Sequence, residues 1–149
     1  NPKDVVKAVA DLQAKNYELQ KEIERLQKER AVIIKQELKS KVVELNGTHF
    51  LGEIVMMDAG SVKDILFQLK GEYPSFLGVI GGHQDDKCSL SIILTDDLIQ
   101  NKGLNAGNLI KETASLIQGG GGGQSFFATA GGKNTAGLNL AIELIKGKL

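Results

Sequence analysis

The chain has 149 residues, with 18 Lys and Arg balancing 18 Asp and Glu, one cysteine and no tryptophan. This length holds one ordinary domain with an appendage, and zero net charge excludes indiscriminate nucleic-acid binding by bulk charge. The single Cys88 excludes an internal disulfide, and no apolar run approaches about 20 residues, so we expect a cytoplasmic protein rather than a secreted or membrane one.

The first residue is Asn1 rather than Met, which indicates a piece of a longer protein. From Pro2 to about Leu45 the chain contains no glycine, which predicts one long helix. Its apolar residues alternate spacings of three and four, as in a coiled coil. The predicted dimer seam consists of Val9, Leu12, Asn16, Leu19, Ile23 and Leu26.

A helix of that length spans about 60 Å, too long for one small domain to cover, so it needs a partner. The partner is either a second copy of the helix or an upstream segment of the parent protein. Asn16 on the seam either fixes the register of a dimer or is simply solvated. The opposite face carries a basic stripe, explained equally by solvation or by RNA contact: Lys21, Lys28 and Lys35, with Arg25 and Lys39 beside them.

Asn46-Gly47 ends the predicted helix and divides the chain into a stalk, residues 1–46, and a globular domain, residues 47–149. The domain alternates strand-like and helix-like segments, which predicts an α+β fold with a mixed sheet. We expect strands over 49–57, 76–80, 88–94 and 126–129. We also expect a helix that is capped by Asp58 or Ser61 and stops at Gly71, a helix that starts at Asn105 or Asn108 and runs through Ile117, a last helix over 135–145, and a short turn from Asp96.

Five consecutive glycines, Gly119 to Gly123, follow the helix that ends near Ile117. They form either a flexible linker or a concavity whose bare amides hold an anion or another backbone. Gly131-Gly132 are expected to supply positive φ where the chain turns into its last helix. Neither a P-loop nor a G-x-G-x-x-G motif fits the stretch.

The remaining reactive side chains form no recognisable catalytic or metal-binding set. His49, His83 and Cys88 are not at ligand spacings, so we predict no metal site. The carboxylate pairs at Asp85 and Asp96 have adjacent members that point apart, as solvated turn residues do. The chain itself is therefore predicted to have no catalytic residues.

The glycine run, followed by Ala130-Gly131-Gly132-Lys133-Asn134, resembles the signature near the end of the DHHA1 domain in the form found at the C-terminus of alanyl-tRNA synthetases. The resemblance covers roughly residues 50–149. This chain has Gln124-Ser125-Phe126 where many family members have Arg-Pro-Asp, so the role of that arginine is not carried over.

The resemblance implies a domain that contacts the tRNA elbow, on a stalk that dimerises or tethers the other domains of an alanine–tRNA ligase. ATP, Mg and Zn are expected in that parent enzyme only, and no cofactor in this chain. We predict RNA contact at Gly121, Gly122, Gly123, Gln124, Gly131, Gly132, Lys133, Lys102 and Lys111. The alternative is the substrate-binding half of a DHH-family phosphoesterase, which needs a histidine after the glycines where this chain has Gln124-Ser125.

Overall fold

The computed structural model describes all residues, 1–149, and divides them into two compact units, 1–36 and 37–149. None of its helices is long and apolar enough to cross a bilayer. The elements in chain order are α1 (Pro2–Ser40), β1 (Val43–Leu45), β2 (Thr48–Val55), α2 (Ala59–Glu72), β3 (Phe76–Gln84), β4 (Lys87–Leu94), α3 (Asp96–Lys102), α4 (Ala106–Thr113), the 3₁₀ helix η1 (Ala114–Ile117), β5 (Gly120–Gly123), β6 (Phe127–Gly132) and α5 (Gly137–Lys146).

The first helix is shorter than predicted. It ends at Ser40, and residues 43–45 form strand β1, which pairs antiparallel with β2. Asn46 and Gly47 are the two turn residues, with φ of 51° and 82°. Two left-handed residues match the twist of a tight hairpin, which is why Asn-Gly is a strong hairpin signal. The prediction was wrong because this dipeptide was interpreted as a helix end.

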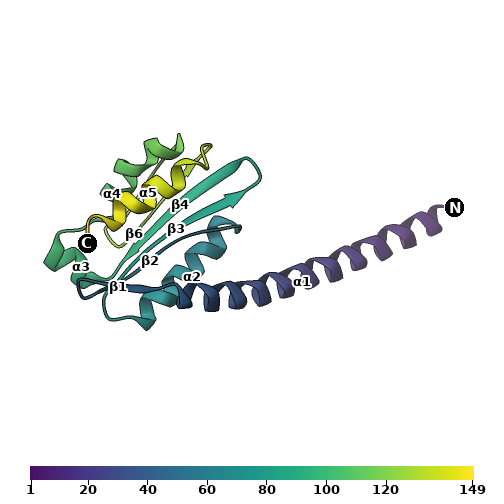
Figure 1. Cartoon of the computed structure of the whole chain (residues 1–149). Coiled ribbons are helices and arrows are strands. Elements are labelled where there is room, and N and C mark those ends of the chain that lie inside the picture. Colours follow the sequence, from purple (N-terminus) through teal and green to yellow (C-terminus); the bar gives the residue numbers. More distant parts are fainter. The chain divides into compact units, whose positions relative to one another are not determined.

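The second unit contains one six-stranded sheet with the order β1-β2-β3-β4-β6-β5 (Figure 1). Only β2 and β3 are parallel, because α2 lies between them in the chain and carries it back to the same end of the sheet. The other neighbouring strands are antiparallel. The glycine strand β5 is thus the last strand at one edge of the sheet.

Helices cover both faces of this sheet (Figure 1). Helix α2 buries Val62, Ile65, Leu66 and Leu69 on one face. Helices α4 and α5 pack on the other, against alternate strand residues such as Val79, Leu90 and Ile92. The predicted α+β class, a long helix followed by a mixed-sheet domain, is confirmed. So are the strands predicted from 49, 76 and 88, and the helices led by Asp58 and Asn105.

The cap of α2 provides a pH-dependent test of this fold. The carboxylate of Asp58 accepts hydrogen bonds from the Ser61 hydroxyl at 2.7 Å and the Ser61 amide at 3.0 Å, and these bonds lower the pKa of Asp58 below its ordinary 3.8. A lowered folded-state pKa gives stability that is present above the ordinary pKa and lost as pH falls through the folded value. We expect Asp58→Ala to reduce the free energy of unfolding at pH 7 by about 1 kcal/mol, and by progressively less below pH about 4.

Urea titrations at pH 7 and pH 3 measure both effects. Asp58→Asn is the control, because it keeps an acceptor oxygen and cannot titrate. Equal stability of Asp58→Ala and the unmodified chain at pH 7 would show that the cap is dispensable.

Candidate nucleic-acid interface

The five-glycine run forms an edge strand rather than a loop. Gly120 to Gly123 pair antiparallel with β6, from Gly120 opposite Gly131 to Gly123 opposite Ala128. All four strand residues are exposed, and no strand pairs with their outer edge. An exposed edge of backbone amides and carbonyls is a template for another backbone. The linker interpretation is therefore wrong, and the interpretation as a close-approach surface remains.

The glycines of β5 fall into two alternating sets. A Cβ on Gly121 would lie 2.0 Å from the carbonyl oxygen of Thr129, and one on Gly123 would lie 2.5 Å from that of Phe127. At Gly120 and Gly122 a Cβ would meet nothing within 4 Å. The first set is required by the contact with β6. The second set leaves the outward side of the strand bare although the fold has room for side chains there.

The second glycine pair lies in β6, and neither Gly131 nor Gly132 has positive φ. The amides of Lys133 and Asn134 both donate to the carbonyl of Ile117, at 2.9 Å each. The predicted turn at Gly131-Gly132 is therefore wrong, because these residues continue the sheet. The amides of Lys133 and Asn134 are also not free to bind an anion, because they bond to η1. The Lys133 side chain is exposed, and its contact with RNA stays a prediction.

The turn between β5 and β6 is held by α4. The backbone N–H of Gln124 donates to Phe127 O at 2.8 Å. The first two backbone N–H groups of α4, on Ala106 and Gly107, donate to Ser125 O and Gln124 O. These bonds occupy amides that a helix N-terminus otherwise leaves unpaired. The edge strand is thus fixed to the body of the domain, and Gln124 itself is exposed.

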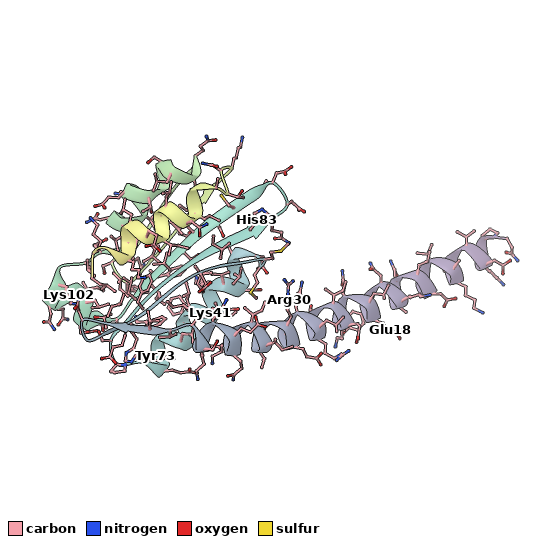
Figure 2. The ribbon with its side chains drawn as sticks, viewed as in Figure 1. Glu18, Arg30, Lys41, Tyr73, His83 and Lys102 are labelled. Atoms are coloured by element: carbon pink, nitrogen blue, oxygen red, sulfur yellow. The ribbon has the colours of Figure 1, made fainter.

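The two other lysines predicted to contact RNA, Lys102 and Lys111, lie in different places. Lys111 is exposed on α4, which packs beside β5. Lys102 ends α3 (Figure 2). Its Nζ lies 3.4 Å from the Thr48 hydroxyl at the start of β2. Three strands separate β2 from β5 in the sheet, so Lys102 is not brought to the glycine strand.

Helix α2 supplies two cations that were not predicted from the sequence, Lys63 and Lys70. Lys63, Phe67 and Lys70 are spaced four and three apart, so they lie on one side of the helix, next to its buried stripe. This side meets Phe126 and Phe127, with Phe67 and Phe127 ring centroids 5.2 Å apart. Phe126, just before β6, and Phe127, its first residue, are both half-buried. The spacing of these three residues on one side of α2 is visible in the sequence, but their contact with Phe126 and Phe127 is not.

The basic stripe on α1 is partly neutralised. Arg25 forms ion pairs with Glu22 and Glu29 on its own helix, which raise the pKa of Arg25 and lower that of Glu22. Lys39 pairs with Glu72 of α2 at 2.8 Å. These pairings reduce the charge that the stripe presents to a polyanion, and favour the interpretation as a solvated face.

The other reactive groups are dispersed. His83 lies near the tip of the β3–β4 hairpin, where Asp85 adopts a φ of 55°, far from Lys102 (Figure 2). Cys88 is buried in β4, and burial raises the pKa of its thiol. No group of three His, Cys, Asp or Glu residues is arranged to hold a metal ion.

The fold and this edge define a class: a mixed-sheet α+β domain whose terminal strand is made of glycine. The model of the DHHA1 domain matches residues 47–149, and the chain belongs to that family. It is 45% identical over 143 residues to the alanine–tRNA ligase of Christiangramia forsetii, which is 96% of this chain and 16% of that protein. It is 43% identical over 146 residues to the alanine–tRNA ligase of Bacteroides fragilis, and the match covers 97% of this chain and 17% of that protein. The chain thus spans about a sixth of the length of these curated relatives.

Two solved structures have the same fold. One is the C-Ala domain from Aquifex aeolicus alanyl-tRNA synthetase, with a TM-score of 0.65 and 21% identity over 73% of this chain and 97% of that one. The other is the DHH domain of a member of the s1p family of ribosomal proteins, with a TM-score of 0.52 and 15% identity over 82% of this chain and 31% of that one.

Proposed function

We propose that this chain is the C-terminal domain of an alanyl-tRNA synthetase and contacts the elbow of tRNA along strand β5. Its partners are tRNA, a second copy bound through α1, and the remaining domains of the synthetase. The parent enzyme would ligate alanine to its tRNA in the cytoplasm and edit mischarged tRNA. The chain itself binds without catalysing.

The bare outward side of β5 is the observation that carries the proposal. Gly120 and Gly122 are exposed, and a Cβ on either would meet no atom of the domain. A packed fold therefore does not explain why both positions lack side chains. A sugar-phosphate backbone can approach such a strand more closely than it can approach any strand with side chains.

Cations lie beside this edge without forming a dense patch. Lys63 and Lys70 extend from α2, Lys111 from α4 and Lys133 from the end of β6. These few cations can neutralise only a handful of phosphates. The isolated chain should therefore bind tRNA weakly, and its affinity should depend only slightly on salt concentration. The parent enzyme gains affinity by holding one tRNA at several points.

The chemistry of ligation belongs to other domains in this proposal. ATP, Mg and Zn would bind there, and this chain needs no cofactor to contact RNA. The second candidate, half of a DHH-family phosphoesterase, is supported only at the level of fold, and Gln124 and Ser125 follow the glycines instead of the histidine it requires.

The test is a titration of the chain with folded tRNAs of different identity and with an unstructured RNA of equal length. We expect the folded tRNAs to bind alike and more tightly than the unstructured RNA, because shape rather than sequence is read. Gly122→Val and Lys133→Ala should each weaken tRNA binding, the first by placing a branched side chain on the bare side of β5.

Gly71→Val is not a suitable control, because valine inside a helix changes stability, so Lys146→Ala on α5 serves as the matched loss of one exposed lysine. Circular dichroism must show that each variant is folded. The proposal fails if unstructured RNA binds equally well, or if folded Gly122→Val binds tRNA as the unmodified chain does. Enzymatic deacylation of tRNA by the pure chain would contradict the non-catalytic role.

A further inference from the structure

A groove opens beside the glycine strand on the side of the sheet that carries α2. It has a volume of about 290 Å³. Its lining includes three aromatic residues, Phe67 of α2, Phe126 and Phe127, together with Thr129, Gly122 and Gly123. Lys63 is the one charged residue in its lining, which contains no carboxylate. The groove is therefore aromatic, positively charged and continuous with the bare strand.

The aromatic rings form an open cluster rather than a closed core. Phe67 and Phe127 are tilted by 47° with centroids 5.2 Å apart, and Phe67 meets Phe126 edge to face at 6.3 Å. Phe67 is 38% exposed, and Phe126 and Phe127 are half-buried. Each of the three residues is thus partly accessible to solvent and lines the groove.

Two lysines cover the accessible ring faces. Lys63 Nζ lies 5.6 Å from the Phe127 centroid and 5.9 Å from that of Phe67, and Lys70 Nζ lies 5.0 Å from that of Phe126. Such contacts are weak at an exposed site, so an incoming ligand displaces them easily. Flexible lysine stems let the ammonium groups move from a ring to a nearby anion.

We propose that this groove is a stacking subsite for one unstacked base of RNA, whose backbone runs along β5. The base stacks on the ring of Phe67 or Phe127, and Lys63 and Lys70 exchange their ring contacts for the flanking phosphates. This inference rests on the proposed function and names the part of the RNA that the interface takes in.

The groove fits this ligand better than an apolar protein side chain. Its volume is at the lower limit of the roughly 300–1,000 Å³ of small-molecule sites, which suits a single planar ring system. Unpaired bases of RNA stack on aromatic side chains, and every base has a π-face, so the contact does not depend on sequence. A purely apolar ligand would leave Lys63 and the exposed glycine backbone without a complementary group.

A tryptophan reporter tests the subsite directly, since the chain has no tryptophan of its own. Phe67→Trp places an indole on the wall of the groove, and a stacked base quenches its fluorescence. The probes are folded tRNA, an unstructured oligoribonucleotide, and a ribose-phosphate oligomer of the same length without bases. We expect both base-containing RNAs to quench, and the oligomer without bases to leave the fluorescence unchanged at equal charge.

Two leucine variants measure the contribution of the rings to affinity. Phe67→Leu and Phe127→Leu keep apolar volume while removing the π-face, and each should weaken binding of tRNA by roughly 5- to 100-fold. Tyr73→Leu is the matched control, because Tyr73 is an aromatic residue at the end of α2 (Figure 2). Its ring stacks on Phe76, and the residue does not line the groove. The affinity of the Tyr73→Leu variant for tRNA should equal that of the unmodified chain.

The outcomes separate this subsite from the proposed function. If the unmodified chain prefers folded tRNA but Phe67→Leu and Phe127→Leu bind it normally, the subsite is wrong and tRNA recognition stands. If unstructured RNA binds as well as tRNA and still quenches the reporter, the subsite stands and elbow recognition is wrong. Absence of quenching by saturating RNA, or equal quenching by the oligomer without bases, overturns the subsite.

Discussion

Gly121→Ala is expected to destabilise the domain by about 3 kcal/mol or more, although it adds a single methyl group to an exposed strand. The added Cβ would lie 2.0 Å from the Thr129 carbonyl oxygen and 2.4 Å from the Ala130 Cα. Both are backbone atoms of β6, which is held in turn by β4, so neither can move without disturbing the sheet. The variant must separate β5 from β6 or distort both strands.

Gly122→Ala is the matched control, because the same methyl group is added one residue further along the same strand. A Cβ there meets nothing within 4 Å, and Gly122 does not have positive φ. We expect its stability to lie within about 1 kcal/mol of the unmodified chain, and the change can be stabilising because alanine restricts the unfolded state. Urea denaturation of both variants measures the difference. Similar stabilities for the two would show that β5 does not pack on β6 as described.

The hairpin at Asn46-Gly47 shows what a local pattern can and cannot decide. The same two residues end helices and form tight hairpin turns, because both structures need left-handed backbone. Val43 and Leu45 before the turn are typical of strands, and they pair with Phe50 and Thr48. Weighing these residues together with the Asn-Gly dipeptide would have predicted the hairpin and the end of the helix near Ser40.

The glycine strand could not be predicted in this way. Glycine is depleted in strands and adds no side chain to a hydrophobic face, so no periodicity marks residues 120–123. They form a strand because β6 lies alongside and because Gly121 and Gly123 let the two backbones come unusually close. That reason is a tertiary contact, visible only once the position of β6 is known.

The candidate site was only partly predictable, because it too depends on tertiary contacts. The sequence pointed to the glycines and to Lys133, but it placed Lys102 with them and left out α2. The order of the sheet decides this, since β6 returns to pair with β4 instead of following β5 outward, and thereby places Phe127 opposite Phe67. Lys63 and Lys70 lie on α2 next to its buried stripe, and they can be assigned to the site only once Phe126 and Phe127 are known to lie beside them.

The seam of α1 leads to the prediction with the largest effect on assembly. Residues 1–30 are all exposed, and the seam includes Val9, Leu19, Ile23 and Leu26 at 48%, 54%, 53% and 50% exposure. An apolar stripe of this length is unfavourable in water, and helices without a partner are only marginally stable. We expect the chain to form a dimer through this helix when no upstream segment is present, with dissociation that depends on concentration.

Leu19→Lys combined with Leu26→Lys is expected to weaken that dimer by roughly 1,000-fold or more. Each dimer contains four such leucines, and burying one contributes about 1.5–3 kcal/mol, which a charged ammonium on the seam would remove. Ala10→Lys with Ala14→Lys adds the same charge away from the seam and should leave the dimer intact, since alanine and lysine have similar helix propensities. Sedimentation equilibrium distinguishes the two pairs. A chain that remains strictly monomeric at high micromolar concentration would instead assign the seam to an earlier segment of the parent protein.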